Sequence, residues 1–362
     1  MIYNNFQDLK LSALGMGCMR FPTLENDNEI DYELTEKMVA QAFEAGINYF
    51  DTAWFYHGGN SETVIGSILK NYPRDSFYLA TKFPGIDPEH GMESVQQIFE
   101  KQLKKCQVEY FDFYLYHNVT DRRLDMMLDP KHGIHDYLME QKRLGRIKHL
   151  GFSTHGSISC IKTFLETVGN DMEFCQIQLN WLDWKLQNAQ EKVQMLNDRN
   201  IPIWVMEPVR GGRLVNLPET DTAILTGLRP GVTTPEWAFR FLQGIPGVTM
   251  VLSGMSNPQQ LAENIQTFST HAPLNEAELA ATLEIADRMI AANAVPCTGC
   301  NYCVDHCPMN IPIPTVIKAF NEKATAPENP GPADCVACGQ CKIHCPQGID
   351  IPVVMKAYAD KQ

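Results

Sequence analysis

Eight of the twelve cysteines lie within 49 residues near the end of the chain. They form two groups, and each group spells Cys-x2-Cys-x2-Cys-x3-Cys-Pro. Thiolates are soft metal ligands, and three of them at this spacing can wrap one face of a compact inorganic cluster. The pattern predicts two cluster-binding loops. The first has Cys297, Cys300, Cys303 and Cys307, and the second has Cys335, Cys338, Cys341 and Cys345.

The similarity of the two groups extends past the cysteines. Residues 307–320 and 345–358 share Cys, Pro, two Ile, a further Pro, Val, Lys, Ala and an aromatic residue, 38 residues apart. Such a repeat indicates two copies of one unit, each a cysteine loop followed by a short helix. Residues 321–334 are rich in Pro, Gly and charge and predict a surface loop between the copies. Two tetrahedral zinc sites are the alternative, but zinc rarely needs a third cysteine at this spacing followed by Cys-Pro.

This tail resembles the bacterial-type two-cluster ferredoxins over about 65 residues. The resemblance implies two [4Fe-4S] clusters with crossed ligation, in which the fourth cysteine of each group binds the other cluster. One cluster would be bound by Cys297, Cys300, Cys303 and Cys345, and the other by Cys335, Cys338, Cys341 and Cys307. His306 and His344 each precede a fourth cysteine. A surface or hydrogen-bonding role is favoured for both, because each cluster already has four thiolates.

A second set of reactive side chains lies at predicted strand ends earlier in the chain. Asp51, Lys82 and His117 each end a β-rich run, and Tyr56 follows Asp51 by five residues. Reduction of a carbonyl by hydride requires a proton donor, and a phenol with a pKa of about 10 donates poorly unless it is tuned. Lys82 would lower the pKa of Tyr56, and Asp51 would keep Lys82 charged and oriented. His117 would hydrogen-bond the substrate oxygen.

Eight short apolar runs are the elements that must position these residues. They span residues 13–18, 47–53, 77–83, 111–117, 147–153, 174–180, 201–207 and 248–254. Segments with helical periodicity, such as 34–46 and 93–106, lie between them. This alternation over about 250 residues predicts a (β/α)8 TIM barrel, whose chemistry gathers at the C-terminal strand ends. A doubly wound sheet is the alternative, but Gly15-Met16-Gly17 lacks the third glycine of its dinucleotide fingerprint.

Four segments are similar to the aldo-keto reductase family: residues 51–62, 80–83, 115–118 and 151–154. The likeness covers about residues 5–285. It implies that Asp51, Tyr56, Lys82 and His117 are the catalytic tetrad and that NAD(P)H binds without a Rossmann fold. The cofactor contacts that it implies are Ser153 and Gln176 for the nicotinamide, Pro208, Val209 and Gly212 for the pyrophosphate, and Gly254, Gln260 and Asn264 for the adenosine.

Three positions depart from the commonest family pattern. Thr154 replaces an Asn, and Met206 replaces an aromatic residue that stacks on the nicotinamide in many members. Residues 253–264 lack the Lys and Arg that commonly bind a 2′-phosphate, which leaves the choice between NADH and NADPH open. Arg210 or Arg213 could supply that charge, and a surface position for either is the alternative.

Composition narrows the class of protein. The 362 residues carry a net charge of -13, which disfavours binding to nucleic acid or an anionic membrane surface. No leader pattern and no run of about 18 apolar residues is present, so a cytoplasmic protein is expected.

The remaining cysteines, Cys18, Cys106, Cys160 and Cys175, lie singly among apolar neighbours and predict buried, inert thiols. Residues 275–295 predict a helix after the barrel, which puts the domains at 1–294 and 295–362.

Three functions remain open at this stage. The first is an enzyme that reduces an aldehyde or ketone, or oxidises the alcohol in the reverse direction, while its clusters exchange electrons with the active site or with a redox partner protein. The second is a plain aldo-keto reductase in which the clusters only stabilise a small domain. The third is a redox-sensing scaffold without catalysis, against which the complete tetrad argues.

Overall fold

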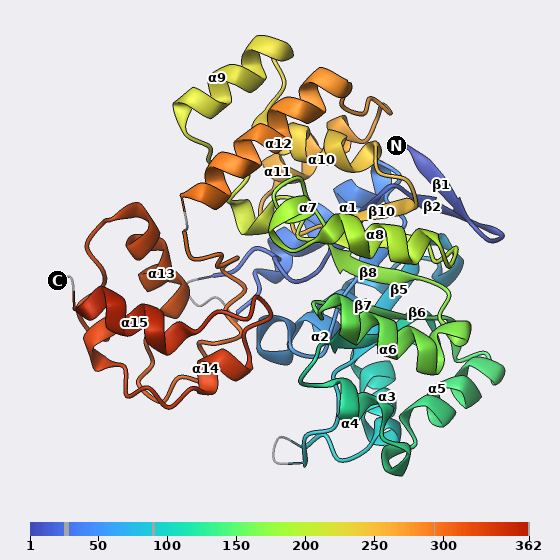
Figure 1. Cartoon of the computed structure of the whole chain (residues 1–362). Helices are drawn as coiled ribbons and strands as arrows, with labels where there is room; N and C mark the ends of the chain where they lie inside the picture. The colour runs from blue at the N-terminus through green and yellow to red at the C-terminus, as the bar shows by residue number, and fades with distance from the viewer. Residues whose placement is uncertain (25–28, 89–90, 293, 361–362) are drawn as a thin grey trace. The chain divides into compact units, whose positions relative to one another are not determined.

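The computed structural model describes residues 1–362 except 25–28, 89–90, 293 and 361–362. Contacts divide the chain into two compact units (Figure 1). The barrel unit comprises Met1–Pro208 and Glu236–Ala277, and the second unit comprises Val209–Pro235 and Glu278–Gln362. Within the described residues, no helix is both long and apolar enough to cross a lipid bilayer.

The barrel unit contains a closed barrel of eight parallel strands in the order β10-β3-β4-β5-β6-β7-β8-β9. Every predicted run forms one of these strands, and closure of the sheet excludes the doubly wound alternative. The strands are β3 (Leu14–Gly17), β4 (Tyr49–Asp51), β5 (Tyr78–Phe83), β6 (Phe111–Val119), β7 (Ile147–Thr154), β8 (Cys175–Gln178), β9 (Ile203–Met206) and β10 (Val248–Ser253).

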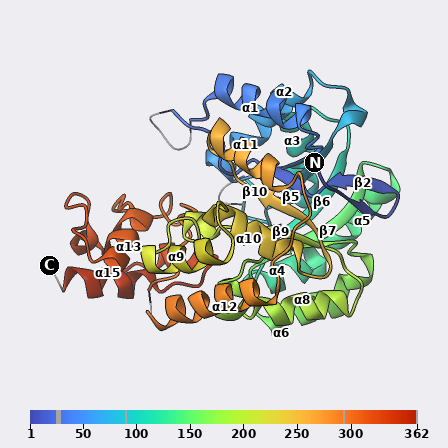
Figure 2. The same cartoon turned by 90° about the horizontal axis from the view of Figure 1, so that it is seen from above.

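Helices surround these strands (Figure 2). Both helices that periodicity predicted are present, and local signals set their ends. The Asp31 side chain accepts a hydrogen bond from Leu34 N at the start of α1, and Gly46 with φ +85° follows the end of that helix. Ser94 caps α3 in the same way. The helices are α1 (Tyr32–Glu44), α2 (Ser61–Leu69), α3 (Val95–Cys106), α4 (Leu124–Leu128), α5 (Ile134–Arg143), α6 (Ile158–Val168), α7 (Asp183–Leu186), α8 (Ala189–Asn197), α10 (Thr234–Gln243) and α11 (Pro258–Thr267).

An N-terminal hairpin, formed by β1 (Tyr3–Phe6) and β2 (Leu9–Ser12), was not predicted. Its strands have only four residues each, too few for a clear alternation of apolar and polar positions. Phe6 is buried, and its ring meets the Trp204 ring edge-on at 5.1 Å between centres. The hairpin thus contributes a side chain to the apolar cluster that fills the barrel.

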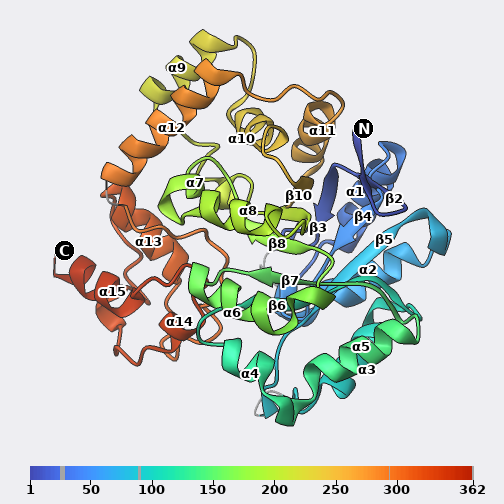
Figure 3. The ribbon, with the colours of Figure 1, turned by 45° about the vertical axis from the view of Figure 1, so that its right-hand side comes forward.

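The second unit contains α9 (Glu219–Leu228), most of α12 (Glu276–Ala291), α13 (Ile313–Glu322), α14 (Gln340–Ile343) and α15 (Ile351–Ala359). Helix α12 follows the predicted range, and Figure 3 shows α9 beside it. Two ion pairs hold these helices together: Arg229 Nη2 lies 2.6 Å from Glu278 Oε2, and Arg288 Nη2 lies 2.7 Å from Asp221 Oδ1.

The repeated helices are present in the second unit. Helices α13 and α15 begin at Ile313 and Ile351, which are 38 residues apart, as the sequence repeat requires. Both of these isoleucines are buried in one core with Val316 and Met355. The repeat therefore describes two structural copies that share an apolar core.

Candidate active site and cluster-binding cysteines

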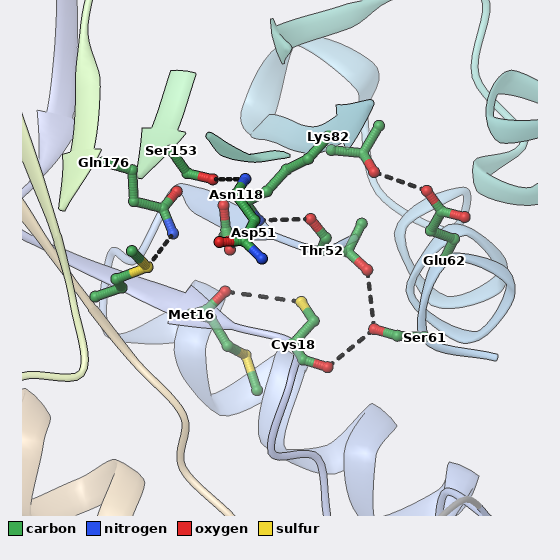
Figure 4. A network of polar contacts seen from close by, with 12 residues as sticks. Met16, Cys18, Asp51, Thr52, Ser61, Glu62, Lys82, Asn118, Ser153 and Gln176 are labelled. Atoms are coloured by element: carbon green, nitrogen blue, oxygen red, sulfur yellow. Dashed lines mark hydrogen bonds and ion pairs between the residues drawn. The ribbon is translucent and has the colours of Figure 1, made fainter. Parts of the chain in front are cut away.

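The structure brings the four predicted catalytic side chains together (Figure 4 shows Asp51 and Lys82). Lys82 Nζ donates to Asp51 Oδ1 at 2.7 Å and to the Thr52 carbonyl at 2.8 Å. The same nitrogen lies 5.1 Å from the centre of the Tyr56 ring. The rings of Tyr56 and His117 meet edge-on with their centres 6.2 Å apart. A cation, a phenol and an imidazole thus share one site.

Strand register explains this convergence. Asp51 is the last residue of β4 and lies opposite Ala80 of β5. Lys82 is two residues beyond Ala80 and pairs with Leu115, and His117 is two residues beyond Leu115. Because side chains alternate along a strand, each two-residue step keeps the same face of the sheet while moving towards the C-terminal end. All three side chains therefore gather at the end of the barrel where the family's chemistry is expected.

Tyr56 reaches the site from a short turn after β4. Its backbone N–H donates to the Ala53 carbonyl at 3.2 Å, and the turn continues through η1 (Tyr56–Gly59). His57 in this turn has φ +52°, a left-handed conformation that is strained for a residue other than glycine. The Tyr56 side chain is buried, with 8% of its surface exposed.

Burial controls the charges in the site. Desolvation raises the pKa of Asp51, while the Lys82 ammonium opposes that shift. Desolvation, assisted by the Lys82 charge, holds the pKa of His117 well below its ordinary value. The His117 imidazole is consequently neutral at pH 7, and Lys82 with Asp51 forms a buried ion pair.

A buried network behind Lys82 was missed by sequence reasoning. Glu62 Oε1 accepts hydrogen bonds of 2.7 Å from both Thr81 Oγ1 and Gln102 Nε2, and its other oxygen pairs with Lys105 at 2.8 Å. Gln102 also donates to the Lys82 carbonyl at 2.9 Å. The network fixes the backbone that carries Lys82. Glu62 is the last residue of segment 51–62, and the resemblance of that segment to the family was the signal that could have pointed to it.

Ser153 and Gln176, the residues expected at the nicotinamide, lie opposite each other on β7 and β8. Ser153 Oγ accepts a hydrogen bond from Asn118 N at 2.9 Å (Figure 4). Gln176 Nε2 points to Met206 Sδ at 3.7 Å. Gln176 Oε1 is buried, and no hydrogen-bond partner for it exists among the described residues. A buried acceptor of this kind fits the amino group of a nicotinamide carboxamide.

The residues expected at the pyrophosphate follow β9. Pro208 ends a segment of the barrel unit, whereas Val209 and Gly212 belong to the second unit. Gly212 N donates to the Val209 carbonyl at 3.1 Å, and Gly212 has φ +92°. A Cβ atom on Gly212 would meet no other atom within 4 Å, so the backbone here faces open space. A phosphate group fits beside such a backbone.

The residues expected at the adenosine follow β10. Asn264 Nδ2 donates to Ser253 Oγ at 3.1 Å, and Gln260 Oε1 accepts from Ser256 N at 2.8 Å. A Cβ atom on Gly254 would come within 2.6 Å of the Arg20 side chain. Sequence reasoning overlooked this basic residue, which lies three positions beyond β3 and so far from residues 253–264 in sequence.

The second unit gathers the eight cysteines into two quartets. The thiols that act electrostatically on Cys303 belong to Cys300, Cys297 and Cys345, and those that act on Cys341 belong to Cys335, Cys307 and Cys338. This grouping is crossed between the two halves of the repeat. Burial first, and the neighbouring sulfurs next, raise the pKa of the Cys341 thiol to about 11. We call the sets the Cys303 quartet and the Cys341 quartet.

The four thiols of the Cys341 quartet line one small pocket that is partly open to solvent. Apolar side chains, among them Ile311, Ile313 and Met355, complete its wall. The described residues contain no group of three His, Cys, Asp or Glu side chains close enough to bind a single metal ion, as a tetrahedral zinc site requires. Four thiols gathered around one apolar pocket suit an iron-sulfur cluster. His306 and His344 stack on each other with ring centres 3.4 Å apart.

The four scattered cysteines are all buried, as predicted. Desolvation raises the pKa of each of these thiols above its ordinary value. Little thiolate is present at neutral pH, so they are poor nucleophiles and poor metal ligands.

The fold and the two sites define a (β/α)8 oxidoreductase barrel combined with a cysteine-rich domain of ferredoxin type. Residues 13–287 match the model of the aldo/keto reductase family, and residues 296–349 match that of the 4Fe-4S dicluster domain. The chain belongs to the aldo/keto reductase family of oxidoreductases and carries a C-terminal 4Fe-4S domain.

Individual relatives are distant. The probable aldo-keto reductase 1 of Glycine max is 28% identical over 216 residues, which cover 57% of this chain and 58% of that protein, less than two thirds of its length. The NADH-specific methylglyoxal reductase of Escherichia coli (strain K12) is 22% identical over 327 residues, 78% of this chain and 97% of that protein. The solved structure of aldo-keto reductase AKR11C1 from Bacillus halodurans (holo form) has a TM-score of 0.65 and 26% identity, and the match covers 79% of this chain and 96% of that one.

Proposed function

We propose that this protein is an NAD(P)H-dependent reductase that interconverts an aldehyde or ketone with its alcohol, and that two [4Fe-4S] clusters in its C-terminal domain transfer electrons. The observation that carries the catalytic half is the buried Lys82–Asp51 pair beside Tyr56. A buried cation with its own counter-ion next to a phenol is an arrangement for proton donation at neutral pH.

The chain's own residues divide the reaction between them. Lys82 stabilises the phenolate of Tyr56, so the Tyr56 hydroxyl gives its proton to the alkoxide that forms on the substrate. Neutral His117 orients the carbonyl oxygen without placing a second cation beside Lys82. Ser153 and Gln176 hold the carboxamide of the nicotinamide. The nicotinamide ring, when bound, supplies the hydride. Asp51 keeps Lys82 charged.

The two cysteine quartets support the electron-transfer half. Four thiolates each would bind one cluster, and a bound [4Fe-4S] cluster exchanges single electrons. Cys338 in the Cys341 quartet is exposed, and the neighbouring Val336 has 59% of its surface exposed. An exposed ligand beside an apolar side chain suits transient contact with a one-electron carrier protein, the redox partner in this proposal.

The first experiment tests each half separately on protein purified without oxygen. We expect about eight iron atoms and eight sulfides per chain, from two four-iron clusters. The first assay uses methylglyoxal with NADH, because the Escherichia coli relative is named as an NADH-specific methylglyoxal reductase. NADPH and other aldehydes follow, and cluster absorbance is recorded with each dinucleotide.

Tyr56→Phe is the decisive variant for the reductase. Loss of the proton donor should lower kcat by about 10²- to 10⁴-fold while dinucleotide binding persists. Tyr72→Phe is the matched control, because the Tyr72 ring stacks on Phe43 at 4.0 Å and the stack survives removal of the hydroxyl. The scaffold function would be supported instead if the wild type reduced no carbonyl compound and Tyr56→Phe had no effect. Clusters that never exchange electrons while turnover continues would support the plain reductase.

A further inference from the structure

Arg210 is fully buried, although the sequence left open a surface position or a contact to a cofactor 2′-phosphate. Its guanidinium donates from Nη1 to the Pro296 carbonyl at 3.1 Å and from Nη2 to Gln347 Oε1 at 3.3 Å. All three residues belong to the second unit. Pro296 directly precedes Cys297, and Gln347 follows Cys345 by two residues. Arg210 therefore bonds both cysteine loops that carry ligands of the Cys303 quartet.

The backbone around Arg210 is shaped for this contact. Arg210 has φ +50° and Gly211 has φ +60°, so two successive residues adopt the left-handed conformation. A Cβ atom on Gly211 would lie 1.9 Å from the Thr298 carbonyl oxygen, so only glycine fits against the first cysteine loop. A left-handed arginine is unfavourable and persists where its surroundings require it. The loop is thus built to rest on the Cys297 segment.

The charge of Arg210 has a definite effect at this place. A guanidinium stays protonated in proteins. Reduction of a cluster adds one negative charge, and a cation in a low-dielectric surrounding stabilises the reduced form. Pro296 adjoins Cys297 and Gln347 lies two residues after Cys345, and both of these cysteines belong to the Cys303 quartet. The effect should therefore be much larger on the cluster of the Cys303 quartet.

We infer that Arg210 is a positioning residue that raises the reduction potential of the cluster bound by the Cys303 quartet and links that cluster to the dinucleotide. The inference rests on the two clusters and the nicotinamide cofactor of the proposed function. The link arises because Arg210 lies between Val209 and Gly212, the residues expected at the pyrophosphate. An anionic pyrophosphate bound there offsets part of the Arg210 charge and lowers the potential. By reciprocity, reduction of the cluster weakens dinucleotide binding.

The test is a redox titration of the whole protein, followed by electron paramagnetic resonance, which resolves two midpoint potentials. Arg210→Gln should lower one midpoint potential by about 59 mV and leave the other unchanged. For a one-electron step this shift equals a tenfold change in the ratio of reduced to oxidised cluster. Cys338→Ser removes an exposed ligand of the Cys341 quartet and so identifies which signal is which. Arg210→Lys keeps the charge and should recover most of the potential.

Arg213→Gln is the matched control, since it removes the same charge three residues along the same loop. ADP-ribose serves as a dinucleotide fragment without a nicotinamide, and it should lower the same midpoint in the wild type but much less in Arg210→Gln. Equal shifts of both midpoints, no shift at full iron content, or an equal shift in Arg213→Gln would each overturn the inference. An iron content near zero in the wild type would instead contradict the proposed function.

Discussion

Lys82 Nζ lies 2.7 Å from Asp51 Oδ1, and the two side chains are only 1% and 4% exposed. Either charge alone would be costly at such burial, because neither could be solvated by water. The pair is further held by the Thr52 carbonyl, which accepts a second hydrogen bond from Lys82. The two residues therefore act as one structural element of the site.

Removing one partner of this pair should destabilise the barrel unit strongly. Lys82→Met leaves a buried carboxylate without its counter-ion, and we expect a loss of about 3–5 kcal/mol in the free energy of unfolding. The double variant Asp51→Asn/Lys82→Met should lose less than the sum of the single variants. Urea unfolding followed by tryptophan fluorescence reports on this unit alone, because all five tryptophans lie in it: Trp54, Trp181, Trp184, Trp204 and Trp237.

The exposed pair Lys131–Asp129 provides the control. Lys131 Nζ lies at the same 2.7 Å from its carboxylate, but the two side chains are 70% and 32% exposed. Lys131→Met should change stability far less than Lys82→Met, because solvent screens an exposed pair. Strictly additive effects of the Asp51 and Lys82 substitutions would refute the coupling.

His117 should stay neutral across the working pH range. Burial and the Lys82 charge hold its pKa well below the ordinary value, so the folded protein protonates His117 only at a lower pH than the unfolded chain does. The unfolded chain does take up this proton near pH 6.5, so His117 costs the folded state stability below that pH. The measurement is histidine NMR, with the His117 resonance identified from its loss in His117→Asn. A His117 resonance that titrates near pH 6.5 in the folded protein would contradict the prediction.

Pairs of cysteine variants should reveal the crossed ligation. Cys303 and Cys345 belong to one quartet, so Cys303→Ser/Cys345→Ser should lose no more iron than either single variant, about half of the total. Cys303→Ser/Cys307→Ser removes a ligand from each quartet and should lose nearly all of it. Iron and sulfide analysis with native mass spectrometry measures both. The reverse pattern would show that each group of four consecutive cysteines binds its own cluster.

Glu173 should contribute stability that depends on pH. Burial alone would raise its pKa, but hydrogen bonds from His149, Lys142, Gln7 and Leu150 N outweigh burial and lower the pKa to about 2. Gln7 lies in the turn of the N-terminal hairpin, so the carboxylate ties that hairpin to β7. Glu173→Gln should cost about 1–3 kcal/mol at pH 7, the range for bonds to a charged group.

The sign of the pH effect follows from the lowered pKa. The stabilisation by Glu173 is complete above the unfolded-state pKa of about 4.3 and is lost as pH falls towards 2. The difference between wild type and Glu173→Gln in urea unfolding should therefore stay constant above about pH 4.3 and shrink as the pH falls from there towards 2. Glu140→Gln is the control, because its 47% exposed side chain pairs with Arg143 in a surface bridge. A difference that does not change with pH would refute the assignment.

Much of the fold could be predicted because its signals are local. Alternating apolar runs and helical segments gave all eight barrel strands, and the 38-residue repeat located α13 and α15. The hairpin was missed, since short strands carry too little pattern. The convergence of Asp51, Lys82 and His117 was also predictable, because residues at the ends of parallel strands must meet at one end of a barrel.

The sequence by itself determined the two cysteine groups, the barrel and the residues that end its strands. Only the tertiary structure decided that Val209–Pro235 packs with the cysteine-rich tail and that Arg210 is buried against Pro296 and Gln347. Those contacts join residues 86 and 137 positions apart. No periodicity encodes contacts at such separations. They arise when folding removes a charged side chain from water and the chain supplies the hydrogen-bond acceptors that make its burial tolerable.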